Sequence, residues 1–189
     1  TYDELGQVTK VTTPGGSESS AQYDSMGRTT SAVDALGHAT AYEYDSLGRR
    51  TKVTYADGTF VTYTYNANGQ VLTATDQLGG VTAYAYDNAG RLVSTTDPRG
   101  GVTTQTYDAV GNLVMTTDAL GSETTYTYNA NNQIAAVTDA EGGVTSYAYD
   151  ANGRISTLTD AEGGKTAYTY GAKGNVTKIV DAGGNTTTY

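Results

Sequence analysis

The feature of the sequence that most constrains its fold is a tyrosine that recurs every 21 residues. The chain has 189 residues, nine times 21, and the period runs from end to end without insertion or deletion. The periodic tyrosines are Tyr2, Tyr23, Tyr44, Tyr65, Tyr86, Tyr107, Tyr128, Tyr149 and Tyr170. Such self-similarity is typical of repeat proteins, in which each unit packs mainly against its neighbours. We therefore expect residues 1–189 to form a single array of nine repeats.

Each repeat contains two turn sequences. The first follows the periodic tyrosine and places Gly three residues after Asp or Asn, as in Asp24 and Gly27, with Asn132 in place of the Gly in one repeat. Gly and Asn tolerate positive φ best, which predicts a left-handed residue at that point. The second turn begins eleven residues after the tyrosine and reads Asp-x-x-Gly in seven repeats. All 14 Asp residues lie in these turns, where a carboxylate can accept a hydrogen bond from the backbone N–H two residues on.

The two segments between the turns have the length and pattern of β-strands. In the segment that ends at the periodic tyrosine, Tyr84 and Tyr86 alternate with Ala83 and Ala85, so the two tyrosines share one face. The other segment has apolar residues three apart, as in Ile155 and Leu158, and these cannot lie on one face of a flat strand. We therefore expect a bulge or a strong local twist there.

The composition agrees with a thin sheet. Leu, Ile, Val and Phe number only 28 of 189 residues, a proportion typical of disordered chains, but 17 Tyr and many Thr supply surface and β-propensity that this count omits. The pattern predicts an all-β fold of about 18 short strands in antiparallel hairpins. Because open twisted sheets seldom exceed ~10 strands without curling, we expect a curved or spiralling β-sheet wall. A solenoid with a narrow filled core is the alternative.

The first turn carries the residues of a known repeat. The sequences concerned are Tyr23–Arg28 (YDSMGR), Tyr44–Arg49 (YDSLGR), Tyr86–Arg91 (YDNAGR) and Tyr149–Arg154 (YDANGR). They resemble the YD repeat of the Rhs (rearrangement hotspot) family, and the resemblance covers all nine units. The trailing Arg is Gln or Asn in the other repeats, and Gly171 replaces the Asp in the ninth. These departures question an obligatory role for either residue.

The resemblance implies a hairpin per repeat, stacked into a spiralling sheet that is part of a hollow shell or tube. In bacterial toxins of this family the shell surrounds a toxic C-terminal domain, and in teneurin-like relatives a similar shell serves cell adhesion. The family's aspartyl self-cleavage segment and a variable toxin domain do not occur in this sequence. We therefore expect a structural module of a secreted, cell-surface or toxin-delivery protein that encapsulates or carries another polypeptide. Its partners would be flanking YD repeats and a C-terminal cargo or toxin domain.

No motif in the chain predicts an enzyme. The only histidine is His38, with no Cys in the chain to act as a nucleophile. Carboxylate pairs such as Asp139 with Glu141 recur in the repeated turns, as do Asp160 and Glu162, and this repetition favours a structural role. The acidic turns also differ from the Gly-Gly-x-Gly-x-Asp repeat of calcium β-rolls. We predict no catalytic, cofactor-binding or metal site.

Charge and surface chemistry bear on the other partners that the chain could have. With 11 Lys and Arg against 20 Asp and Glu, the chain lacks the basic face that nucleic-acid binding requires. No apolar run approaches the ~18 residues of a transmembrane helix, so no membrane insertion is expected. The alternative functions are an extracellular adhesion module, a filament formed through the end strands, or a glycan-binding surface made by exposed Tyr rings.

Overall fold

The computed structural model describes residues 1–189, and all of its regular elements are β-strands. The chain divides into two compact units, Thr1–Gly101 and Val102–Tyr189. The first contains β1 (Lys10–Thr12), β2 (Glu18–Tyr23), β3 (Thr29–Val33), β4 (Ala39–Tyr44), β5 (Arg50–Thr54), β6 (Phe60–Tyr65), β7 (Val71–Thr75), β8 (Val81–Tyr86) and β9 (Leu92–Thr96). The second contains β10 (Val102–Tyr107), β11 (Leu113–Thr117), β12 (Glu123–Tyr128), β13 (Ile134–Thr138), β14 (Val144–Tyr149), β15 (Ile155–Thr159), β16 (Lys165–Tyr170), β17 (Val176–Val180) and β18 (Thr186–Thr188).

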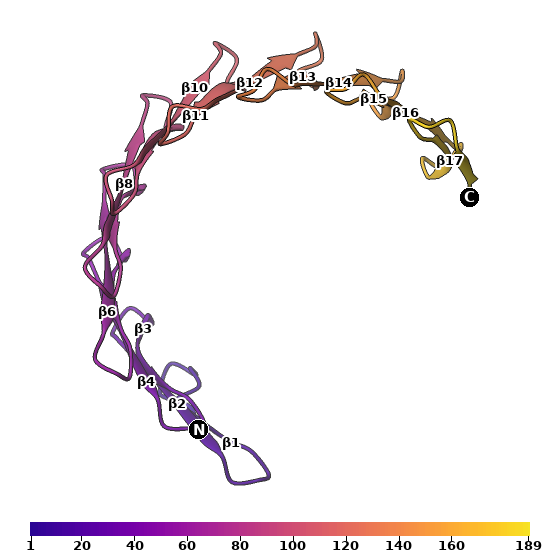
Figure 1. Cartoon of the computed structure of the whole chain (residues 1–189). Helices are drawn as coiled ribbons and strands as arrows, with labels where there is room; N and C mark the ends of the chain where they lie inside the picture. The colour runs from indigo at the N-terminus through magenta and orange to yellow at the C-terminus, as the bar shows by residue number, and fades with distance from the viewer. The chain divides into compact units, whose positions relative to one another are not determined.

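Within each unit the chain forms an antiparallel meander. Each strand pairs with the strand that precedes it and the strand that follows it in the same unit, and the strands lie in one layer (Figure 1). The sheet does not close on itself in either unit. The all-β fold with 18 short antiparallel strands in hairpins is therefore confirmed.

The turns have the conformation that their Gly and Asn residues indicate. In the turn that begins at Asp24, the N–H of Gly27 donates to the Asp24 carbonyl (3.0 Å), and the N–H of Asp24 donates to the Arg28 carbonyl (2.9 Å). This is the three-residue hairpin loop whose third residue is left-handed. The left-handed residue is Gly in 17 turns, and in the remaining turn it is Asn132 with φ 58°. The two atypical second turns, which begin at Thr13 and Tyr55, make the same pair of backbone bonds.

A β-bulge accounts for the apolar residues that are three apart. In the pairing of β14 with β15, Tyr149 lies opposite Ile155 and Tyr147 lies opposite Leu158. The register shifts between these two pairs, because one extra residue, Ser156, is accommodated on β15. The bulge brings Ile155 and Leu158 to the same face of the sheet, as predicted from their spacing.

The two faces of the sheet differ in chemistry. One side of the sheet, here called the Tyr face, carries the periodic tyrosines, the residues two places before them, and the cross-strand partners of both. The pairs Tyr84 with Thr95 and Tyr86 with Leu92 are an example. The opposite face carries Thr, Ser, Ala and charged residues, among them the ion pair of Lys52 Nζ with Glu43 Oε1 (3.2 Å).

The sheet has almost no buried core. Val53, at 7% exposure, is the single buried residue, and no side chain is fully buried. A single layer can only half-cover its side chains, so stability must come from cross-strand contacts and hydrogen bonds instead of a packed interior. The solenoid with a filled core was therefore the wrong alternative, because nothing packs against either face within a unit.

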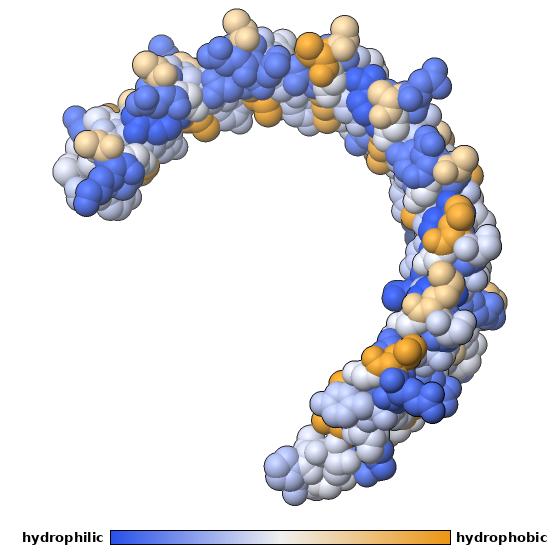
Figure 2. Space-filling model, turned by 180° about the vertical axis from the view of Figure 1, so that it is seen from behind, coloured by the Kyte–Doolittle hydropathy of each residue, from blue (hydrophilic) through white to orange (hydrophobic).

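Apolar side chains also stand at the hairpin tips. Leu36, Leu78 and Leu120 are 82%, 97% and 92% exposed in the second turns of alternate repeats. In the space-filling view, apolar residues form separate orange patches divided by hydrophilic surface (Figure 2).

None of the elements is a helix long and apolar enough to cross a membrane.

Candidate functional site

The Tyr-Asp turn, which runs from each periodic tyrosine to the residue five places later, is where the repeats are joined. The Asp carboxylate of this turn accepts hydrogen bonds from backbone N–H groups of the loop. Oδ1 of Asp24 accepts hydrogen bonds from the backbone N–H groups of Met26 (2.9 Å) and Arg28 (3.0 Å). The first bond was predicted from the sequence, and the second closes the loop around the carboxylate.

The trailing arginine pairs with the carboxylate of its own turn. Nε of Arg28 lies 2.7 Å from Oδ2 of Asp24, and Arg49 pairs in the same way with Asp45. Both arginines therefore form an ion pair with the carboxylate of their own turn. The hydrogen bond from the Arg28 backbone N–H, and with it the Arg28 side chain, lowers the pKa of Asp24. The pKa of Asp150 is lowered chiefly by the hydrogen bond from the Arg154 side chain.

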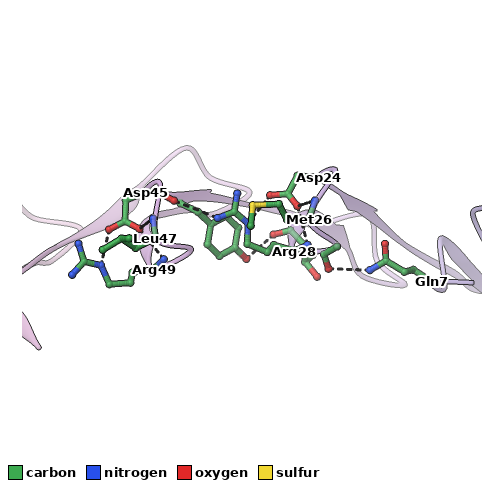
Figure 3. A network of polar contacts seen from close by, with 10 residues as sticks. Gln7, Asp24, Met26, Arg28, Asp45, Leu47 and Arg49 are labelled. Carbon is green, nitrogen blue, oxygen red and sulfur yellow. Dashed lines mark hydrogen bonds and ion pairs between the residues drawn. The ribbon is translucent and has the colours of Figure 1, made fainter. Parts of the chain in front are cut away.

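The same arginines reach into the following repeat (Figure 3). Nη1 of Arg28 donates to the backbone carbonyl of Asp45 (3.3 Å), one repeat further along the chain. The Arg28 guanidinium also lies over the ring of Tyr44, 4.7 Å from its centroid. Arg49 repeats both contacts, with a bond of 2.7 Å to the Asn66 carbonyl and a distance of 4.8 Å to the Tyr65 ring. Arg28 and Arg49 therefore each form an ion pair within their own turn and contact the next turn by a hydrogen bond and a cation–π contact.

Glutamine at the arginine position makes an equivalent connection. The Nε2 atoms of Gln7, Gln70 and Gln133 donate to the carbonyls of the left-handed glycines of the next repeats, at 2.9, 2.6 and 2.8 Å. Asn112 is shorter and donates to the side chain of Asn132 (3.2 Å). The position therefore requires a side-chain N–H donor that reaches the next turn, and a positive charge is not essential.

The hydroxyl of the periodic tyrosine forms a second link between hairpins. The OH of Tyr44 in β4 donates to the backbone carbonyl of Thr29 in β3 (2.7 Å). The last backbone pair between these strands is Ser31 with Ala41, so Thr29 lies beyond the ladder. The phenol thus bonds a carbonyl that lies beyond the backbone pairing of β3 with β4. Six more tyrosines make the same bond, namely Tyr23, Tyr65, Tyr86, Tyr128, Tyr149 and Tyr170.

The residues considered for catalysis or metal binding lie in the second turns. His38 is largely exposed, and its Nδ1 lies 2.9 Å from Oδ2 of Asp34 in the same turn. Asp139 Oδ1 accepts the backbone N–H groups of Glu141 (3.1 Å) and Gly143 (2.7 Å), as a loop-capping residue does. No group of three or more His, Asp or Glu side chains is placed to hold a metal ion.

Two functional contacts were not foreseen from the sequence, although each had a signal. The periodic position is Tyr, never Phe, in all nine repeats, which indicates that the hydroxyl has a partner. The trailing residue is Arg, Gln or Asn in every repeat, and these three side chains share an N–H donor. Neither pattern indicates which backbone carbonyl accepts the hydrogen bond, because that carbonyl lies 15 to 20 residues away along the chain.

The fold and the contacts of the Tyr-Asp turns define a tandem β-hairpin repeat protein. Its repeats are joined by recurring hydrogen bonds from side chains to the backbone. The model of the RHS repeat family matches the chain over residues 2–39, 23–59, 65–102, 89–123, 107–144, 128–165 and 149–186. The chain belongs to this family of RHS repeats, as its YD motifs indicate. No curated protein sequence matches it.

Several solved structures share the fold at low sequence identity. The crystal structure of TcdB2-TccC3 without the hypervariable C-terminal region is 17% identical, with a TM-score of 0.59 over 94% of this chain. The Photorhabdus luminescens Tc holotoxin pore with a mutant TccC3 is 16% identical, with a TM-score of 0.65 over 89% of this chain. A complex named TcdB2-TccC3-Cdc42 is 17% identical, with a TM-score of 0.60. The chain spans only 12% of the length of each of these proteins.

Proposed function

We propose that this chain is a structural wall module of a secreted or toxin-delivery protein, and that the wall encloses or carries another polypeptide. The observation that carries the proposal is the array itself, in which every specific contact belongs to a recurring turn or strand. An enzyme site is normally one constellation with its own environment. A surface built from repeats suits enclosure, where area and continuity are needed.

The similarity in fold to the Tc toxin proteins supports this proposal. Those chains are about eight times longer than this one, and one of the structures is described as lacking a hypervariable C-terminal region. By analogy, the partners of this chain would be further RHS repeats and a C-terminal cargo or toxin domain. The single array of nine repeats, the curvature of the wall and an extracellular location are parts of the same proposal.

Protection of the cargo from protease tests the proposal. In the parent protein, the C-terminal segment should resist a nonspecific protease until the wall is opened by denaturant. The same segment expressed without the repeats should be digested rapidly. Equal digestion rates with and without the wall would exclude encapsulation.

An extracellular adhesion or glycan-binding module is the second candidate, because the rings of the Tyr face are only half-covered. Aromatic rings exposed in this way can stack on sugars. Titration calorimetry with ligands from a glycan array, on the native chain and on Tyr84→Ala, would separate the two functions. Binding that is lost in this variant supports adhesion. Sedimentation over a wide concentration range would also test filament formation, since a monomer throughout counts against it.

A further inference from the structure

The Tyr face has a gap in the second repeat. Two places before the periodic tyrosine, six repeats carry a further tyrosine: Tyr42, Tyr63, Tyr84, Tyr126, Tyr147 and Tyr168. The second repeat has Ala21 at this place, and its cross-strand partner is Ala32. In the next repeat the corresponding pair is Tyr42 with Val53, and there Val53 is 7% exposed. Two methyl groups therefore stand where a phenol ring covers the sheet elsewhere.

The gap is a hollow of about 300 Å³. Its side chains on the Tyr face include Val8, Val11, Ala21, Tyr23 and Ala32. Val8 and Val11 are 40% and 50% exposed, so their apolar surface is open to a ligand. The volume lies at the lower end of the ~300–1,000 Å³ of ligand pockets, a size that suits one ring.

The Tyr23 ring beside the hollow is held in place by a hydrogen bond, and the side chains around the hollow present no unpaired charge to a ligand. The OH of Tyr23 donates to the Val8 carbonyl (2.8 Å), which holds the Tyr23 ring beside the gap. Lys10 borders the hollow, but its ammonium pairs with Glu18 at 2.7 Å. A ring inserted here would meet apolar side chains, the Tyr23 ring and Ser19, which is paired with Val11 on the same face. Aromatic pairs attract at centroid distances of about 4.5–7 Å.

We propose that the hollow at Ala21 binds one aromatic side chain, Tyr or Phe, of the polypeptide that the wall carries. This inference rests on the proposed function for the source of the side chain. The bound ring would take the place that a tyrosine of the chain itself takes in six other repeats. The carried polypeptide would thereby be held at a defined repeat of the wall.

Nuclear magnetic resonance with N-acetyl-L-tyrosinamide as the probe tests the proposal on the full chain. We expect saturable shifts of the signals of Val8, Val11, Ala21 and Ala32, and no such shifts with N-acetylglycinamide, which lacks the ring. Shifts spread equally over the Tyr faces of all repeats would overturn the proposal.

Filling the hollow supplies the second arm. Ala21→Tyr introduces the residue that six other repeats have at this place, so the variant should fold. We expect its affinity for the probe to fall at least tenfold. Ala32→Leu fills the hollow from β3, because Leu158 occupies the equivalent position in its own repeat. This variant should lower the affinity for the probe in the same way. Ala41→Tyr is the matched control because it adds a ring to the opposite face. Undiminished binding in both filled variants would contradict the proposal.

The outcome is separable from that of the protease experiment. Protection of the cargo without probe binding at Ala21 would refute this inference and leave the wall function intact. Probe binding at Ala21 without protection of the cargo would refute the encapsulation and also the role of the hollow in holding cargo.

Discussion

The periodic tyrosine acts through both its ring and its hydroxyl. The ring of Tyr44 contacts the Arg28 guanidinium, while its hydroxyl bonds the Thr29 carbonyl. Its neighbour Tyr42 has the same ring on the same face and an arginine, Arg50, 4.6 Å from the ring centroid, but it makes no comparable hydroxyl bond. The two positions therefore separate the contribution of the hydroxyl from that of the ring.

Tyr44→Phe should lower the free energy of unfolding by about 1 kcal/mol, because it removes the hydrogen bond from the Tyr44 hydroxyl to the Thr29 carbonyl. Tyr42→Phe is the control and should have little effect, since the ring is kept and no hydroxyl bond is lost. Urea denaturation followed by circular dichroism measures both variants. Equal effects would mean that the hydroxyl bond contributes nothing.

At the scale of elements, the hairpin turn decides where each strand ends. The left-handed residue can be Gly or Asn, and both occur at the same point of the turn with positive φ. Gly90 has φ +80°, and a Cβ added there would lie 3.4 Å from the side-chain nitrogen of Gln70. A substitution at Gly90 therefore disturbs the turn and also approaches the link from the preceding repeat.

Gly90→Val should destabilise the chain by roughly 1–3 kcal/mol, because a β-branched residue is forced into the left-handed region. Ala89→Ser, one residue earlier in the same turn, should change stability by less than about 0.5 kcal/mol. Thermal melting of the two variants gives the comparison. If their melting temperatures coincide, the left-handed residue does not limit the stability of the turn.

The link between neighbouring turns also belongs to this scale. Arginine and glutamine at the trailing position reach different carbonyls of the next repeat, that of Asp45 for Arg28 and that of Gly27 for Gln7. The two side chains differ in length and charge, yet both join one hairpin to the next. This explains how glutamine can stand in place of the arginine in other repeats of this chain.

At the scale of the molecule, stability is a sum of many similar small terms, because the sheet has almost no core. Such a stability depends on pH when the same titratable group, here the Asp carboxylate of the turns, recurs along the chain. The pKa of Asp24 and that of Asp87 are lowered, first of all by the hydrogen bonds from the backbone N–H groups of Arg28 and Arg91. The pKa of Asp118 is lowered in the same way by the N–H of Ser122.

The melting temperature should therefore fall in acid. A carboxyl group whose pKa is lower in the folded state stabilises the fold above its unfolded pKa, about 3.9 for Asp, and this stabilisation is lost as pH falls through the folded value. We expect a nearly constant melting temperature from pH 7 to about pH 5 and a decline below about pH 4. Asp24→Asn should make the decline shallower, because Asn holds the same backbone bonds in the turn at Asn66. A melting temperature that rises in acid would contradict the role of the carboxylates.

Much of the fold could be predicted because its determinants are local. The turns follow from Asp and Gly three residues apart, and the Tyr face follows from the alternation of Tyr84 and Tyr86 with alanine. The spacing of Ile155 and Leu158 indicated a bulge or a strong local twist, since no flat strand places them on one face. Each of these features is decided within about ten residues, and the period repeats it along the whole chain.

The sequence by itself determined the repeat length, the hairpins and the family, and it required a bulge or a strong twist in the second strand of each repeat. The tertiary structure alone decided that the tyrosine hydroxyl bonds a carbonyl 15 residues back, and that the trailing arginine or glutamine bonds the next repeat. It also decided that Ala21 and Ala32 stand opposite each other and leave a hollow. The physical reason is that these contacts join residues of neighbouring strands, and only the register of the strands brings a given donor and acceptor within hydrogen-bond distance.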